Sequence, residues 1–192
     1  MTEPSKPALR AGLRAARDGF VLSLGPVERA RLERCAAARL APLIEGAACI
    51  AFYQALGSEL DCAPAMAAAA GRGTLLALPH VAGRDGSMRF LVWAPGDPLE
   101  PGWRGLIQPQ ASAAEIIPDI IVTPLLGFDS TLARIGQGAG FYDRAFAGLP
   151  EAKKIGLGWS VQQCPAIACD PWDVRLDCVV TERATIGKGQ RS

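Results

Sequence analysis

Short apolar runs and longer amphipathic segments alternate along this chain of 192 residues. Apolar runs that end in Gly, Pro or Asp are typical of strands buried in a parallel sheet, and they occupy residues 48–55, 74–81, 119–126, 153–159 and 176–182. Segments with helical spacing of apolar residues, or rich in alanine, predict helices at residues 5–20, 25–44, 63–73 and 141–149. Because strands alternate with helices, we expect an α/β fold: a single layered domain with a mainly parallel central sheet flanked by helices.

One segment departs from this alternation. Residues 83–93, GRDGSMRFLVW, begin with a turn sequence and continue with apolar residues, which predicts an antiparallel strand at the edge of the sheet. We expect one domain over residues 1–192, with an ordered core at 5–186 and loose ends.

Composition and charge narrow the class of protein. Hydrophobic residues make up 49% of the chain and charged residues 20%, as in globular proteins. A net charge of +1 gives no overall field that would attract nucleic acid or an anionic membrane. The N-terminal segment is charged throughout, unlike a signal peptide, and the longest apolar run is too short to cross a bilayer. We expect a monomer with no nucleic-acid and no membrane partner.

The cysteines and the histidine argue against a zinc site. The six cysteines form no CxxC pair, and His80 is the single histidine of the chain. Several cysteines lie in apolar segments, as buried free thiols do. A reducing, cytoplasmic location is therefore the simplest interpretation.

The first predicted helix carries four cations at helical spacing. Lys6, Arg10, Arg14 and Arg17 are spaced 4, 4 and 3 residues apart, so they share one face. Such a stripe is most often a solvated face, and phosphate binding is the alternative.

The stretch ARIGQGAGFYDRAF, residues 133–146, is the most informative segment. Glycines without a Cβ let main-chain N–H groups converge on an anion, and the helix predicted after them offers its N-terminus to a phosphate. Arg134 before the glycines suits phosphate, and Asp143 after them suits Mg²⁺ on that phosphate. The spacing fits neither a Rossmann fingerprint nor a Walker A loop. A turn that only joins strand to helix is the alternative interpretation.

Several other residues are candidates with an ordinary alternative. His80 at a strand end could be catalytic, although a surface or hydrogen-bonded histidine is more common. Glu59 follows a predicted strand, where ligand groups gather, yet loop carboxylates are usually only hydrated. Asp173 and Asp177 could be a metal ligand and a strand cap, or two turn residues. Trp103 could stack on a flat ligand or fill a core edge.

Together these residues carry a resemblance. PDIIVTPLLGFDSTLARIGQGAGFYDR, residues 118–144, resembles the signature of the 5-formyltetrahydrofolate cyclo-ligase family, also called 5,10-methenyltetrahydrofolate synthetases. The resemblance extends over nearly the whole chain. It includes Lys6 and Arg10 near the start, GSELDC around Glu59, and PWDVRLDCVVTE around Asp173.

The resemblance implies an ATP- and Mg²⁺-dependent ligase. Such enzymes convert 5-formyltetrahydrofolate into 5,10-methenyltetrahydrofolate with release of ADP and phosphate, on an α/β fold shared with sugar-phosphate isomerases and CoA transferases. Carried over by position, Arg134 and Tyr142 are implied to be catalytic, and Asp143 and Asp173 to hold Mg²⁺. The implied ATP-binding residues are Lys6, Arg10, Arg134, Gly136, Gln137, Gly138, Ala139, Gly140, Phe141 and Tyr142. The implied folate-binding residues are Gln54, Glu59, Trp103 and Tyr142.

Three positions depart from the family's pattern. Leu125 and Leu132 stand where glycine is usual, and Phe141 replaces a tyrosine. Because leucine avoids positive φ, Leu132 predicts a different turn before Arg134. The alternatives that stay open are a sugar-phosphate isomerase of the same fold, which would need no ATP, and a paralogue that binds folate or nucleotide without turnover. RNA binding through the N-terminal cations is a third alternative, against which the near-neutral charge argues.

Overall fold

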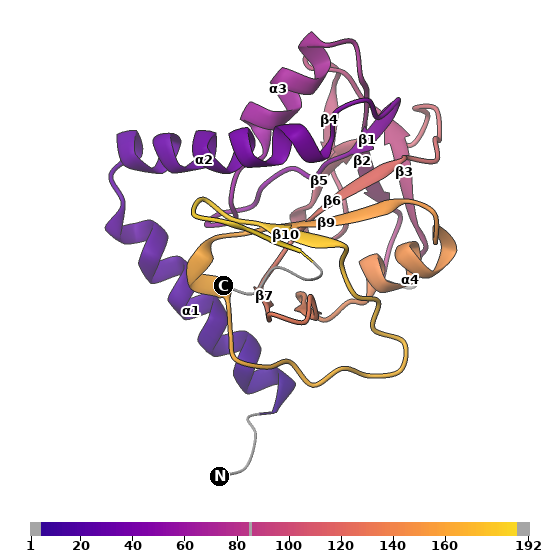
Figure 1. The fold of residues 1–192 in the computed structure, drawn as a ribbon. Coiled ribbons are helices and arrows are strands. Elements are labelled where there is room, and N and C mark those ends of the chain that lie inside the picture. Colours follow the sequence, from indigo (N-terminus) through magenta and orange to yellow (C-terminus); the bar gives the residue numbers. More distant parts are fainter. Residues whose placement is uncertain (1–4, 85, 188–192) are drawn as a thin grey trace.

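A seven-stranded sheet forms the centre of the described part of the chain (Figure 1). The computed structural model describes residues 5–84 and 86–187. Residues 1–4 and 188–192, on which the predicted loose ends mainly fall, lie outside this description, as does Asp85 in the predicted edge segment. The strands run in the order β11-β10-β9-β6-β1-β2-β3.

The sheet is mainly parallel, as predicted. Strands β10, β9, β6, β1 and β2 pair in parallel, and antiparallel strands close both edges. The edge strand β3 pairs with β2, which confirms the predicted antiparallel edge. The bounds of the sheet strands are β1 Cys49–Ala51, β2 Leu75–Val81, β3 Met88–Val92, β6 Ile120–Pro124, β9 Lys153–Leu157, β10 Cys178–Val180 and β11 Thr185–Gly187.

The helices agree with the predicted ranges, and the shortest elements were not predicted. The helices are α1 Lys6–Ser23, α2 Pro26–Leu40, α3 Ala63–Gly71 and α4 Phe141–Gly148, with 3₁₀ turns η1 Ala41–Leu43, η2 Trp103–Gly105 and η3 Ser160–Gln162. Two small hairpins lie outside the main sheet: β4 Leu99–Pro101 with β5 Ile107–Pro109, and β7 Gly127–Phe128 with β8 Arg134–Ile135. Elements of two or three residues carry no periodicity from which they could be predicted.

Helices cover both faces of the sheet. Alternate strand side chains point to opposite faces, so each strand contributes to two cores. Ile50 of β1 belongs to the core that includes Leu40 of α2, and α3 joins the same side. Ile121 of β6 belongs to the opposite core, together with Phe146 of α4. Both faces are therefore apolar, which explains why the strands appear in the sequence as continuous hydrophobic runs.

Helix α1 lies across the carboxyl ends of the parallel strands, below α2 in Figure 1. Leu13 packs against the turn after β6, where a Cβ on Gly127 would lie only 2.4 Å from Leu13 Cδ1. Arg17 reaches Ser58 in the segment that follows β1. The absence of a side chain at Gly127 lets α1 approach the sheet closely and brings its basic face to the strand ends.

Candidate active site

A cavity of about 910 Å³ opens at the carboxyl ends of β1 and β6. Its volume lies within the range of small-molecule sites. The basic face of α1, the segment after β1, the loop between β8 and α4, and the segment around residue 172 form its walls. Every residue to which the resemblance assigned a site role lines this cavity: Lys6, Arg10, Gln54, Glu59, Trp103, Arg134, Gly136, Gln137, Gly138, Ala139, Gly140, Phe141, Tyr142, Asp143 and Asp173.

The four cations of α1 all face the cavity, so the interpretation of the stripe as a merely solvated face is wrong. Arg10 Nε donates to the carbonyl oxygen of Gly136 at 3.0 Å, and Arg14 Nη2 donates to Gln137 Oε1 at 2.5 Å. Arg17 is only 5% exposed. The resemblance covered two of these cations; the structure adds Arg14 and Arg17.

Lys6 joins the start of α1 to the segment before β10. Its Nζ donates to Asp170 Oδ2 at 2.5 Å and to Asp173 Oδ2 at 2.9 Å. Hydrogen bonding to Asp170 raises the pKa of Lys6 above its ordinary value, although burial acts in the opposite direction. Asp170 had no sequence signal, because its partner lies 164 residues away.

The glycine loop between β8 and α4 leaves main-chain N–H groups uncovered by side chains. Gly138 has φ 100° and Gly140 has φ 69°, a region that other residues seldom adopt. Gly140 precedes α4, and no side chain caps this helix start. A helix N-terminus without a side-chain cap attracts anions, which favours the phosphate interpretation of the glycine stretch over a simple connection.

The side chain of Arg134 in β8 is only 6% exposed and is paired with the first turn of α4. Its Nη2 lies 2.6 Å from Asp143 Oδ1, and its guanidinium lies 4.9 Å from the centre of the Phe146 ring. Burial lowers the pKa of Arg134, and the nearby Asp143 carboxylate opposes this shift. Its Nε has no hydrogen-bond partner in the described structure. A buried cation with an uncommitted N–H is suited to an additional anionic ligand.

Asp143 and Asp173 both line the cavity near Arg134 and are suited to share a metal ion with bound phosphate. Within residues 5–84 and 86–187, no group of three or more His, Cys, Asp or Glu side chains forms a metal site. Mg²⁺ is usually held by one or two carboxylates plus phosphate oxygens and waters, so two carboxylates fit this donor set. The negative charges of both carboxylates favour the charged form of Arg134 and so act to raise its pKa.

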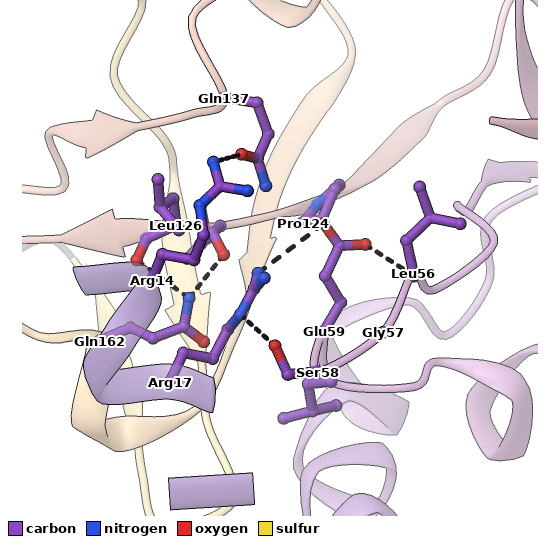
Figure 2. A network of polar contacts seen from close by, with 12 residues as sticks. Arg14, Arg17, Leu56, Gly57, Ser58, Glu59, Pro124, Leu126, Gln137 and Gln162 are labelled. Carbon is purple, nitrogen blue, oxygen red and sulfur yellow. Dashed lines mark hydrogen bonds and ion pairs between the residues drawn. The ribbon is translucent and has the colours of Figure 1, made fainter. Parts of the chain in front are cut away.

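Glu59 lies in the cavity wall beside Arg17 (Figure 2). It is 8% exposed, so the interpretation as a hydrated loop carboxylate is wrong. Its Oε2 accepts from the backbone N–H of Leu56 at 3.0 Å, and its Oε1 lies 3.8 Å from Arg17 Nη1. Burial raises the pKa of Glu59, while the Leu56 N–H and the Arg17 charge lower it.

Aromatic side chains line the cavity near the start of α4. Trp103 packs edge to face on Phe141, with ring centres 5.2 Å apart. Tyr142 also lines the cavity, and burial raises the pKa of its hydroxyl so that it stays neutral. Trp172, which had no predicted role, is 70% exposed and borders the same cavity.

Two candidates lie outside the cavity lining. His80 is buried in β2 and its Nδ1 has no hydrogen-bond partner in the described structure, so it is neither a surface histidine nor bonded at that nitrogen. Asp177 Oδ2 accepts from the backbone N–H of Lys154 at 2.8 Å at the start of β9. Asp177 therefore has a structural role where strands begin.

The expectation of a different turn at Leu132 is wrong. Leu132 has φ 66°, in the left-handed region that glycine favours, and its side chain is 2% exposed. Asp129 Oδ1 accepts from the backbone N–H groups of Thr131 and Ala133, which holds the turn on both sides of Leu132. Leu125 is also buried, and it packs against Gly156: a Cβ added to Gly156 would lie 2.9 Å from Leu125 Cδ1. The side chains of both leucines belong to the hydrophobic core that includes Phe146 of α4.

Comparison with known proteins agrees with the geometry. Residues 2–182 match the sequence model of the 5-formyltetrahydrofolate cyclo-ligase family. A 5-formyltetrahydrofolate cyclo-ligase of Escherichia coli K12 is 27% identical over 169 residues, covering 83% of this chain and 92% of the relative. Its counterpart in Haemophilus influenzae is 32% identical over 93 residues, or 45% of this chain and 50% of the relative.

Two solved structures share the fold. The NMR structure of a 5,10-methenyltetrahydrofolate synthetase of Aquifex aeolicus has a TM-score of 0.77 at 26% identity and covers 96% of this chain and 95% of that one. A synthetase of the same name from Mycoplasma pneumoniae has a TM-score of 0.72 at 22% identity, covering 93% and 99% respectively, and supports the fold alone.

A mainly parallel α/β sheet with a charged cavity at its strand ends defines, with these relatives, an enzyme of the ligase class. More specifically, the chain belongs to the 5-formyltetrahydrofolate cyclo-ligase family. No helix among the described residues is long and apolar enough to span a membrane.

Proposed function

We propose that this protein converts 5-formyltetrahydrofolate, with ATP and Mg²⁺, into 5,10-methenyltetrahydrofolate, ADP and phosphate. One observation carries the proposal: a single cavity joins a basic, glycine-rich end to an end that holds the buried carboxylate Glu59. These two ends match an anionic nucleotide and a ring with N–H donors. Membership of the cyclo-ligase family supports the choice of folate as the second ligand.

The reaction needs activation of the formyl oxygen, which is a poor leaving group as hydroxide. The formyl oxygen attacks the γ-phosphorus of ATP, a new P–O bond forms, and the bond to ADP breaks. The folate N10 then attacks the formyl carbon of the resulting iminium phosphate and loses its proton to solvent, and the C–O bond breaks with release of phosphate. Charge neutralisation and alignment accelerate such a transfer more than a nucleophilic side chain does.

The basic end of the cavity provides this neutralisation. Lys6, Arg10 and Arg134 would bind the phosphates together with the main-chain N–H groups of the glycine loop. Arg10 already bonds the carbonyl oxygen of Gly136, so the helix cation and the loop are held together. Arg134 is rigid because it is buried and paired, which suits it to hold the transferring phosphoryl group.

The metal would be held by Asp143 and Asp173, and it would supply charge neutralisation on the phosphate oxygens. The two carboxylates also orient Arg134 and Lys6 through ion pairs.

At the other end, Glu59 and Gln54 would bind the pterin ring and Trp103 and Tyr142 would contact its faces. The neutral Tyr142 hydroxyl can donate a hydrogen bond to the reacting oxygen. Burial of this end limits access of water, which would otherwise hydrolyse the activated intermediate.

The test is to incubate the purified protein with 5-formyltetrahydrofolate, ATP and Mg²⁺, following the near-ultraviolet absorbance of the methenyl product and the release of ADP. Both products should form together and stop when ATP or the metal is omitted. Asp143→Asn should weaken the Mg²⁺ dependence and lower the rate together, because an amide is a poor ligand for a hard cation. Arg31→Ala, an exposed position that is not part of the cavity lining, is the control.

The alternatives give different outcomes in the same assay. Product that forms without ATP would overturn the phosphoryl mechanism. Binding of ATP and folate without product would indicate a paralogue that has lost turnover. Stabilisation by sugar phosphates and not by ATP would favour an isomerase, and salt-dependent RNA binding would favour the third alternative.

We further propose a single-domain monomer in the cytoplasm. All six cysteines are free thiols, as is usual in a reducing compartment. Gel filtration and localisation of a tagged chain test these two points.

A further inference from the structure

Arg17 carries a buried N–H group without an acceptor. The residue is 5% exposed and lines the cavity, and its Nη1 is one of three buried side-chain nitrogen or oxygen atoms in the described structure that have no hydrogen-bond partner. A desolvated donor of a charged group costs free energy unless an acceptor meets it. Because Arg17 lines the cavity, a ligand bound there can supply this acceptor.

The surrounding residues fix the orientation of the Arg17 guanidinium (Figure 2). Its Nε donates to Ser58 Oγ at 2.8 Å. Ser58 is itself held, because its hydroxyl donates to Asp18 and its carbonyl oxygen accepts from Trp159 Nε1 at 3.0 Å. Nη1 therefore stays beside Glu59 and does not turn away to solvent.

Arg17 and Glu59 present one donor and one acceptor side by side. Nη1 lies 3.8 Å from Glu59 Oε1, which exceeds the length of a hydrogen bond. The other oxygen of Glu59 is bound to the backbone N–H of Leu56 at 3.0 Å, which fixes the plane of the carboxylate. A ligand that places a carbonyl oxygen next to an N–H group would satisfy both side chains at once.

The 4-oxo group and the neighbouring N3–H of a pterin have this arrangement. We infer that Arg17 Nη1 donates to the 4-oxo oxygen of the substrate while Glu59 accepts from the adjacent N–H, and that Arg17 makes the site specific for 4-oxo pterins. This inference rests on the proposed function, because it takes the pterin as the ligand of this end of the cavity.

The inference predicts how the site treats an analogue. In a 4-amino-4-deoxy folate an NH₂ group replaces the oxygen and N3 carries no hydrogen, so the Arg17 donor would meet another donor and Glu59 would lose the N3–H group. A site that is built to bond a substrate group discriminates strongly against an analogue that lacks the matching group. Removing the Arg17 donor should therefore weaken binding of the 4-oxo ligand more than binding of the 4-amino ligand.

The experiment measures dissociation constants for 5-formyltetrahydrofolate and for its 4-amino-4-deoxy analogue, in the wild-type protein and in Arg17→Met. The methionine keeps an unbranched apolar stem and removes every donor. We expect the ratio of the two constants, 4-amino over 4-oxo, to fall on the order of 10- to 100-fold in Arg17→Met, the effect of losing one hydrogen bond from a charged group.

Arg29→Met is the matched control. Arg29 lies on α2 and donates to the carbonyl oxygens of Gly57 and Glu59 at 3.2 and 3.3 Å, so it supports the same segment from outside the cavity lining. Loss of this support should change both constants together and leave their ratio as in the wild type. A ratio that is unchanged in Arg17→Met, or that falls equally in both variants, would show that Arg17 only positions Glu59 and would overturn the inference.

Two further outcomes are informative. If Arg17→Met does not fold, the same ratio of dissociation constants is measured in Arg17→Lys. The lysine ammonium keeps the charge, but it lacks the several N–H groups with which the guanidinium can bond Ser58 and a ligand at once. If the wild-type protein binds neither pterin, the inference is wrong. If it binds them but forms no product, only the proposed function fails.

Discussion

The carboxylate Oδ1 of Asp143 lies 2.6 Å from Nη2 of Arg134, so a proposed metal ligand and a proposed phosphate ligand neutralise each other. The same relationship recurs between Asp173 and Lys6, at 2.9 Å. Each cation is therefore held in place by a carboxylate that has its own proposed task. Loss of one partner leaves the other charged and only partly solvated.

Arg134→Ala should lower turnover and stability together. We expect kcat/KM to fall by a factor on the order of 10²–10³, as for loss of one fixed donor to a transition state. The free energy of unfolding should fall by about 1–3 kcal/mol, because Asp143 loses its partner. Steady-state kinetics and urea denaturation measure the two effects.

The double variant Arg134→Ala/Asp143→Ala separates the effect on turnover from the effect on stability. Removing both partners should restore part of the lost stability, while turnover stays at the level of the single variant or below. Equal stabilities of the single and double variants would show that the ion pair does not couple the two residues.

The glycines of the loop should differ in their tolerance of a side chain. Gly138 has φ 100°, and a Cβ there would lie 3.4 Å from the Arg10 guanidinium carbon. Gly138→Ala should cost about 1–2 kcal/mol and weaken ATP binding, because a Cβ disfavours left-handed backbone. Thermal unfolding and an ATP titration measure these effects.

Gly136→Ala is the control for this prediction. Gly136 does not have positive φ, and a Cβ there would lie 3.6 Å from Arg134 Nη1, an ordinary contact. Its stability should be equal to or slightly above that of the wild type. An equal loss of stability in Gly136→Ala and Gly138→Ala would mean that backbone conformation does not distinguish these glycines.

Much of the fold could be predicted because the parallel strands are buried on both faces. Ile50 and Ala51 point to opposite sides and are both fully buried, so the strand appears as an uninterrupted apolar run. The small hairpins had no such signal, because β7 and β8 contain two residues each. The glycine loop was recognisable because its chemistry is local in sequence.

The rest of the site depends on contacts between distant segments. Arg17 and Ser58 are 41 residues apart, and no local pattern connects them. At Leu132 a local signal was present but misleading. Leucine disfavours positive φ, which predicted a different turn. The hydrogen bonds that Asp129 accepts and the burial of the Leu132 side chain outweigh this backbone preference.

Leu132→Gly should destabilise the protein, although it relieves an unfavourable φ. Left-handed backbone costs a leucine about 1–2 kcal/mol, whereas truncating a buried leucine costs about 2–5 kcal/mol. The side chain is 2% exposed, so the loss of burial should dominate. Denaturant unfolding measures the balance, and a stabilised variant would show that strain exceeds packing at this site.

Stability should decrease at high pH through the buried thiol of Cys62. Burial raises the pKa of Cys62 from its ordinary 9.0 to about 12. Between these values the unfolded chain loses the proton first, so the contribution of the neutral thiol is complete below pH 9.0 and is lost as the pH rises toward 12. The free energy of unfolding should fall with a limiting slope of about 1.4 kcal/mol per pH unit for this group.

Cys62→Ala lacks this titration, so its stability relative to the wild type should improve as the pH rises from 9.0 toward 12, the window set by the two pKa values. Cys169→Ala removes an exposed thiol and serves as the control. A constant difference between Cys62→Ala and the wild type over this range would contradict the prediction.

The contact between Lys6 and Asp173 joins residues 167 positions apart, and it has a consequence during synthesis of the chain. Loop closure over such a separation is slow compared with the formation of helices and local turns. A ribosome-bound chain that ends before Asp170 already contains α1 and the glycine loop, but it lacks both carboxylates that hold Lys6. Nascent chains should therefore acquire ATP affinity late, after the segment that precedes β10 has left the exit tunnel.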